Sequence, residues 1–188
     1  MAANECFLDS ATLRENVVAL ARNIGYVPRS RRSARANISF TVDGLEETST
    51  LTLNAGIVCN GSGSNTNYIF CIPENITVPV VNGLGQFNNV EIFEGNFISQ
   101  NFTVDTSLFN QRYILDNSFI DTSTIKVKVK SSSSSTSSVT YKQIDNIVGV
   151  TSTSNSYLLQ EIEDERYELI FGDNVIGKKL SNNNYIEI

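Results

Sequence analysis

The 188-residue sequence contains no histidine and no tryptophan. The lack of histidine removes the commonest general base and the commonest metal ligand in proteins. No apolar run approaches the roughly 18 residues that a membrane-spanning helix needs, and the N-terminus lacks the charged-then-apolar layout of a secretory signal. We therefore expect the chain neither to be secreted through such a signal nor to insert into a membrane.

Candidates for catalysis and metal binding are also few. The cysteines Cys6, Cys59 and Cys71 are odd in number and widely spaced, which is typical neither of a disulfide framework nor of a zinc site. The acidic segment Glu161–Glu168 could hold a divalent metal or work as an acid–base pair, but no nucleophile or phosphate-binding loop accompanies it. A solvated turn is the simpler interpretation. The sequence therefore indicates a protein without a catalytic residue, metal or cofactor.

One amphipathic helix is predicted over Ala11–Ile24. Leu13, Val17, Leu20 and Ile24 recur at spacings of four, three and four residues, which places them on one face. So short a helix is marginal in water by itself. We expect this chain to bury the apolar face only in part, and a partner to cover the rest.

The ends of this helix carry start and stop signals. Thr12 and Glu15 have the spacing of a capping box, in which both side chains bind early backbone N–H groups. Gly25 supplies a left-handed stop, and Pro28 prevents the helix from resuming.

From Ala36 onward the sequence changes to short alternating segments separated by Gly, Asn, Asp and Ser. The predicted fold is mainly β with a short N-terminal helix (α+β), and its strands form an antiparallel β-sandwich or a barrel-like domain. The expected strands are Asn37–Val42, Thr50–Leu53, Ile57–Cys59, Tyr68–Ile72, Ile76–Val81, Val90–Phe93, Phe97–Val104, Tyr113–Leu115, Ile125–Val129, Val139–Tyr141, Tyr157–Gln160 and Tyr167–Phe171.

A serine-rich run lies between two of these strands. Residues 131–138 are seven serines and one threonine, which predicts the long flexible tip of a hairpin or, alternatively, a domain linker. We divide the chain into a helix with an arginine-rich arm at residues 1–35 and one β-rich domain at residues 36–188, with the hairpin tip at 131–138.

The arm is the most unusual feature of the chain. Five of the eight arginines lie between Arg22 and Arg35, although the net charge is −6. Nucleic-acid binding is disfavoured because the chain is acidic and no aromatic residues interleave the arginines. Because the planar guanidinium pairs well with carboxylates at interfaces, we expect a subunit contact. The segment Glu161–Glu168 of a second copy is one candidate for the opposite charge.

Two parts of the sequence are similar to a known family. The first is Phe7–Ala21 together with Gly25-Tyr26-Val27-Pro28, and the second comprises Asp121–Val127 and Tyr157–Asp173. They resemble the first and later parts of the baseplate wedge subunits of contractile-tailed bacteriophages, the baseplate J-like group. The resemblance is most specific at Gly-Tyr-Val-Pro and Phe-Gly-Asp.

The resemblance implies a structural virion protein rather than an enzyme. Such subunits assemble around the central hub with other wedge subunits and with copies of themselves, so the expected place is the tail baseplate of the virion, reached by assembly in the host cytoplasm. Members of the family are usually several times longer, so we expect a fragment or one domain. The expected subunit interface consists of Arg29, Arg31, Arg32, Arg35, Leu13, Val17, Leu20 and Ile24.

A second hypothesis is a carbohydrate-binding β-sandwich of a tail fibre or adhesin. Exposed aromatic side chains beside Asn- or Asp-rich loops would support it. Tyr68, Tyr113 and Tyr157 are the candidates, although each position also fits the core of a strand.

Overall fold

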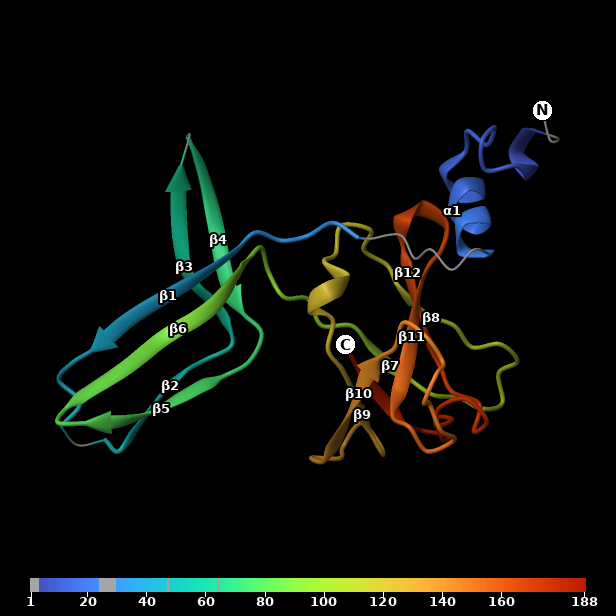
Figure 1. The fold of residues 1–188 in the computed structure, drawn as a ribbon. Coiled ribbons are helices and arrows are strands. Elements are labelled where there is room, and N and C mark those ends of the chain that lie inside the picture. The colour runs from blue at the N-terminus through green and yellow to red at the C-terminus, as the bar shows by residue number, and fades with distance from the viewer. Residues whose placement is uncertain (1–3, 24–29, 47, 64) are drawn as a thin grey trace. The chain divides into compact units, whose positions relative to one another are not determined.

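A computed structural model of the chain describes residues 4–23, 30–46, 48–63 and 65–188. The chain is mainly β, with one short α-helix near the N-terminus and antiparallel sheets, as the sequence predicted (Figure 1). Its contacts divide it into two compact units. We call residues 1–32 with 99–188 the discontinuous unit and residues 33–98 the inserted unit. The division made from the sequence, at residue 35, groups all the strands in one domain.

The inserted unit is one six-stranded antiparallel sheet. Five strands follow the order β2-β5-β6-β4-β3, and β1 lies against β6. The long strand β6 pairs with β1 along most of its length, with β5 at one end and with β4 at the other. The strands are β1 (Arg35–Val42), β2 (Thr50–Leu53), β3 (Gly56–Gly63), β4 (Thr66–Ile72), β5 (Ile76–Val81) and β6 (Leu84–Glu94).

The discontinuous unit contains a seven-stranded sheet with the order β7-β13-β9-β10-β11-β12-β8. Its neighbouring strands are antiparallel except for the parallel pair β10 and β11. The strands are β7 (Asn101–Thr103), β8 (Tyr113–Leu115), β9 (Val127–Lys130), β10 (Ser138–Gln143), β11 (Ser156–Glu161), β12 (Tyr167–Phe171) and β13 (Tyr185–Glu187). The helical elements are α1 (Arg14–Asn23) and the short 3-10 turns Asn4–Cys6, Thr122–Thr124 and Glu163–Glu165.

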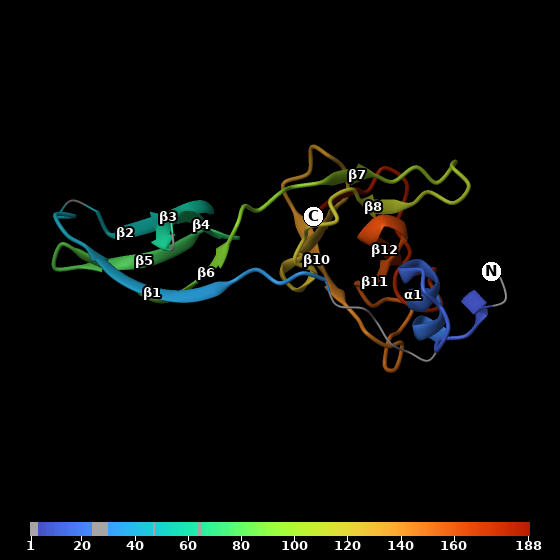
Figure 2. The same ribbon diagram turned by 90° about the horizontal axis from the view of Figure 1, so that it is seen from above.

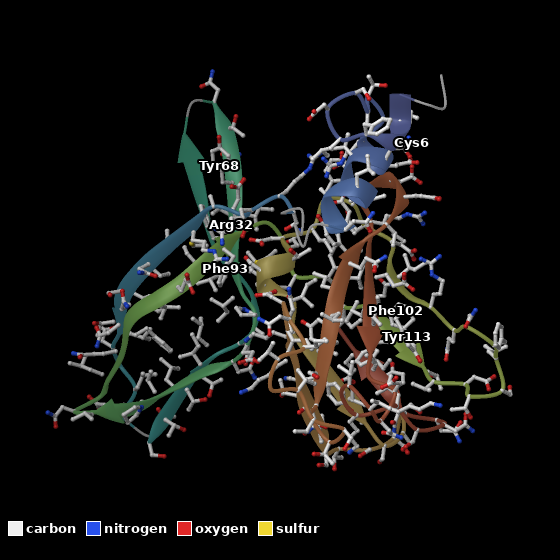
Figure 3. The ribbon with its side chains drawn as sticks, turned by 45° about the vertical axis from the view of Figure 1, so that its right-hand side comes forward. Cys6, Arg32, Tyr68, Phe93, Phe102 and Tyr113 are labelled. Atoms are coloured by element: carbon white, nitrogen blue, oxygen red, sulfur yellow. The ribbon has the colours of Figure 1, made fainter. Side chains whose placement is uncertain are left out.

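The two outer strands of this order, β7 and β8, come together. The rings of Phe102 and Tyr113 meet edge to face with centroids 5.6 Å apart, and Figure 3 shows both side chains. The Gln100 Nε2 atom donates a hydrogen bond of 2.9 Å to the carbonyl oxygen of Ile114. These contacts join the ends of the sheet, so it is nearly closed into a barrel.

The buried core differs between the units. The cluster in the discontinuous unit contains Val104, Leu115, Val127, Val129, Tyr141, Tyr157, Tyr167, Leu169, Leu180 and Ile186. The cluster in the inserted unit contains Ile72, Phe87, Val90 and Ile92, with a rim of half-buried side chains around it. Three tyrosine rings of the discontinuous unit surround Phe171, those of Tyr113, Tyr141 and Tyr157, with centroid distances of 5.3, 5.6 and 6.2 Å.

Two segments differ from the sequence prediction. The loop expected after Cys59 is instead part of β3, which continues to Gly63, and the ring of Phe70 covers the Cα side of Gly61 there. The strand expected over Phe97–Val104 is shortened to Asn101–Thr103, and Ile98 before it is 65% exposed. The alternation of apolar and polar residues does not by itself determine which residues pair with a neighbouring strand.

The hairpin around the serine run is confirmed. Strands β9 and β10 are antiparallel, with Lys130 opposite Ser138. Val127 and Val129 are buried while Lys128 and Lys130 are half-exposed, because successive side chains of a strand point to opposite faces.

Candidate subunit interface

The carboxylate of Glu5 caps the beginning of α1. It accepts hydrogen bonds from the backbone N–H groups of Thr12 and Leu13, at 3.1 and 3.3 Å, and from the Thr12 hydroxyl at 2.7 Å. The Asn16 side-chain amide donates a further bond of 2.9 Å. These bonds, with that from Asn16 the largest contributor, lower the pKa of Glu5 to about 2. A carboxylate suits the positive end of the helix dipole.

The predicted capping box is therefore not the cap that forms. Thr12 binds Glu5 rather than a backbone donor of the helix, and α1 begins at Arg14. The 3-10 turn Asn4–Cys6 brings Glu5 to the helix from eight residues upstream of Leu13. No periodic pattern in the sequence indicates that Glu5 lies against the start of the helix.

The predicted apolar stripe of the helix is only partly covered. Leu13 is 59% exposed, Val17 and Leu20 are half-buried, and Ile24 lies outside the described residues. The buried residues of α1 are Val18 and Ala21, each one position after a residue of the predicted stripe, so the helix buries a face next to the predicted one.

Apolar side chains also extend the exposed surface upstream of the helix. Phe7 is 68% exposed and Leu8 is 45% exposed. The backbone N–H of Ala11 donates to the Phe7 carbonyl oxygen at 2.9 Å, so this segment folds back tightly before α1. Phe7, Leu8 and Leu13 are thus exposed apolar residues on a segment held in place by Glu5; we call them the N-terminal apolar patch.

The arginines of the arm are divided between the two units. Arg29 lies outside the described residues. In the discontinuous unit, the Arg31 guanidinium stacks over the ring of Phe119 at 4.2 Å and lies 3.9 Å from a Glu165 carboxylate oxygen. Arg32 is exposed and forms no ion pair with the part of the chain that the structure describes.

Arg35 belongs to the inserted unit as the first residue of β1. Its guanidinium lies 5.0 Å over the ring of Phe93 and 3.7 Å from Glu91. Arg31 and Arg35 therefore each combine an aromatic ring with a carboxylate, but in different units. Stacking on a ring and pairing with a carboxylate are the contacts that favour arginine over lysine.

The acidic segment is the turn between β11 and β12. Asp164 and Glu165 there both have positive φ, 61° and 56°, a conformation that costs free energy in residues other than glycine. Ile162 N–H donates to the Arg166 carbonyl oxygen at 2.8 Å and closes the turn. A solvated turn between these strands is what the sequence predicted, and the turn forms, but Glu161 is buried rather than solvated.

Arginines of the same chain meet the carboxylates of this segment. Arg14 forms a 2.8 Å ion pair with Glu161, which is 3% exposed, and lies 3.8 Å from Glu165. Arg112 binds Glu168 with two parallel hydrogen bonds of 2.8 and 2.7 Å, and these bonds raise the pKa of Arg112. The contact of this segment with the arm of another copy stays a prediction, and within one chain Arg31 already reaches Glu165.

The other candidate residues lie in structural positions. No disulfide joins the three cysteines, and the Cys71 thiol donates to the Gly95 carbonyl oxygen at 2.9 Å. Burial raises the pKa of that thiol. Tyr157 is buried and Tyr113 packs in the ring cluster, so of the three tyrosines considered for carbohydrate binding only Tyr68 is exposed.

Exposed apolar loop tips form a feature that the sequence analysis did not identify. Phe109 is 94% exposed and Val148 is 86% exposed in the discontinuous unit. Neither lies in a periodic segment, so no pattern distinguished them from buried residues.

No model of a known protein family matches the chain, and no curated protein matches it significantly. Within the described ranges, no three Cys, Asp or Glu side chains are grouped so that they could hold a metal ion. None of the helices described is long and apolar enough to cross a bilayer.

Proposed function

We propose that the chain is a structural subunit of a contractile-tail baseplate wedge, with no catalytic role, and that it assembles through the N-terminal apolar patch and the arginine arm. The observation that carries the proposal is the exposure of Phe7, Leu8 and Leu13 on a segment whose backbone is fixed by Glu5. Exposed apolar side chains on one ordered segment are a candidate for a surface that another protein covers.

Two further observations support the proposal. Arg32 is an exposed charge next to Arg31, which is already stacked on Phe119 and paired with Glu165. The Arg32 guanidinium is therefore available to a carboxylate of a partner. The similarity of Phe7–Ala21 and Tyr157–Asp173 to wedge subunits concerns the segments that form α1 and the β11–β12 turn. Arg14 and Glu161 join these two segments, so the resemblance and the geometry concern the same surface.

Complementation of a phage lacking this reading frame tests the proposal. The deletion should abolish complete baseplates, and the wild-type chain supplied in trans should restore them. Arg32→Glu should restore fewer, because a reversed charge at the rim of the interface repels the carboxylates of the partner. Assembly in vitro should be weakened most at low salt, where the repulsion is least screened. Lys178→Glu, which reverses an exposed cation outside the arm, is the control and should assemble normally.

Normal baseplates in the deletion strain would contradict the proposal. Absence of the chain from purified virions would do the same. Its presence in the fibres alone, with binding to a glycan array, would favour the carbohydrate-binding alternative instead.

A further inference from the structure

The outer edge of β3 is an open strand edge in the inserted unit. β3 is the last strand in its sheet order, and it pairs only with β4 among the described residues. An edge strand presents a row of backbone N–H and C=O groups that another strand can bind. Natural proteins usually protect such edges with charges, prolines or covering elements.

This edge has none of the charges or prolines that protect others. No charged residue lies between Thr48 and Pro73, a stretch that includes both β3 and β4, and neither strand contains proline. All the charged residues of the chain lie outside this stretch, and their net charge is −6. The β3–β4 hairpin is therefore a neutral surface on an acidic protein, where a second copy can approach without local like-charge repulsion.

The distal half of the hairpin is a two-stranded ribbon. β4 pairs with β6 only at Phe70 and Cys71, while Thr66–Ile69 are four consecutive exposed residues. Because successive side chains of a strand alternate between faces, both faces of the ribbon are uncovered there. Figure 1 shows this end of the hairpin turned away from β2 and β5. A two-stranded ribbon is marginal in water, and a third strand with an apolar surface stabilises it.

We propose that β3 is a strand-addition site whose occupant is β3 of a second copy of this chain, paired antiparallel about a two-fold axis. An antiparallel pair of identical strands is compatible with such an axis, because residue i of one copy then lies opposite residue j of the other, and j lies opposite i. Asn60 and Ser62 of β3 have small, polar and exposed side chains. Two copies of the strand can therefore pair without a steric clash at these positions. Ile57 is 62% exposed and would gain cover in the pair. The site does not depend on the wedge assignment, and a monomeric chain would leave that assignment standing.

Sedimentation of the full-length wild-type chain over a range of concentrations is the first measurement. The weight-average mass should rise from 20.7 kDa towards twice that value. The variant Asn60→Glu/Ser62→Glu and the variant Asn60→Lys/Ser62→Lys should each weaken association at least about tenfold, because like charges then face each other across the pair. Mixing the two variants should restore a dimer that contains one copy of each.

Thr50→Glu/Thr52→Glu is the matched control, since it places two charges at exposed positions of another edge strand, β2. This control should dimerise like the wild type. Circular dichroism of every variant checks that the sheet is folded.

A crosslinking measurement covers the case in which the charged variants do not fold. Ser62→Cys in a Cys6→Ser/Cys59→Ser background should give a covalent dimer on mild oxidation, and Thr52→Cys in the same background should not. A wild-type chain that stays monomeric at high concentration would overturn the proposal. So would dimers that persist in both charged variants, a mixture that does not associate, or equal crosslinking at positions 62 and 52.

Discussion

The inserted and discontinuous units use similar strands but bury very different cores. The inserted unit has the longest strands, among them β6 over Leu84–Glu94, yet its cluster contains four buried residues. The discontinuous unit has short strands, none longer than β10 or β11, and its cluster contains ten. Strand length therefore does not decide how much side-chain surface is buried.

The closure of the sheet contributes to the difference, together with the greater length of the discontinuous unit. Contacts such as Phe102 with Tyr113 join the two ends of the seven-stranded sheet, so its inner face is enclosed on all sides. The inserted sheet leaves β1, β2 and β3 as open edges, because each of them pairs with one strand only among the described residues (Figure 2). The stacked rings of Phe40 and Phe87, 4.8 Å apart, bridge β1 and β6 within the smaller cluster of this unit. Short strands can thus surround the larger buried cluster where their sheet closes on itself.

The largest expected effect comes from cavities in the two cores. Leu169 and Ile72 are each 1% exposed, one in each unit. Truncation of either to alanine should cost about 2–5 kcal/mol. We expect Leu169→Ala to lie towards the upper end, because a closed core collapses less readily around a cavity than an open one. Chemical denaturation followed by hydrogen exchange of peptides from each unit measures both values.

Ile170→Ala is the control for Leu169→Ala. Ile170 is the next residue of β12 but points outward and is 40% exposed, so its truncation should cost less than about 1 kcal/mol. A larger loss for Ile72→Ala than for Leu169→Ala would contradict the argument from closure.

Alkaline pH should destabilise the closed unit selectively. Burial raises the pKa of Tyr157 to about 12, and it also raises the pKa values of Tyr113, Tyr141 and Tyr167. Since an unfolded tyrosine titrates near pH ~10, the stability from a neutral buried Tyr157 is complete below that pH and is lost as pH rises to ~12. The loss should reach about 2 kcal/mol near pH ~12.

Unit-resolved hydrogen exchange at two alkaline pH values tests this prediction. Tyr157→Phe should reduce the pH dependence without removing it, because three other tyrosines with raised pKa values remain. The only tyrosine of the inserted unit, Tyr68, is 38% exposed, so that unit should respond less. If the inserted unit opens first at alkaline pH, the ionisation of buried tyrosines does not limit the stability of the chain at that pH.

The next expected effect on stability comes from the close approach of the backbone at Gly172 to that at Gly177. A Cβ atom at Gly172 would lie 2.1 Å from the Gly177 carbonyl carbon, and backbone cannot move aside as a flexible side chain can. Gly172→Ala should therefore cost about 1–3 kcal/mol, as overpacking does. Gly63→Ala in the open unit should cost less than about 1 kcal/mol, because nothing lies within 4 Å of its Cβ position. Thermal unfolding compares the two, and equal losses would mean that the loop around Gly177 shifts freely.

Much of the fold could be predicted from the sequence because strand alternation is local. The strands Thr50–Leu53, Ile76–Val81 and Tyr167–Phe171 have the expected bounds, and the hairpin on either side of the serine run forms as expected. The grouping of strands into two units was not predictable in the same way. It depends on which distant strands pair, such as β13 with β7 and β9, and no local pattern encodes that.

The candidate interface was predictable only in part, for a similar reason. Arginine clustering and the apolar spacing on the helix are visible in the sequence. The cap from Glu5, the stacking of Arg31 on Phe119 and the pair of Arg14 with Glu161 join residues that the fold brings together. The last two pairs are 88 and 147 positions apart in the numbering (119 − 31 and 161 − 14).

The smallest expected effect concerns how α1 is held on the closed unit. Glu161 is 3% exposed and binds Arg14 at 2.8 Å, whereas Glu165 has a 45% exposed side chain and lies 3.8 Å from the same guanidinium. Glu161→Gln keeps the size of the side chain but removes the charge, and Arg14 is itself half-exposed, so solvent screens part of the interaction. We therefore expect a loss of about 1–2 kcal/mol in the protection of the α1 amides against hydrogen exchange. Glu165→Gln keeps the positive φ of that turn residue and should change the protection by less than about 0.5 kcal/mol, as exposed pairs do. Equal effects from the two variants would mean that the helix is held by the burial of Val18 and Ala21 rather than by the buried carboxylate.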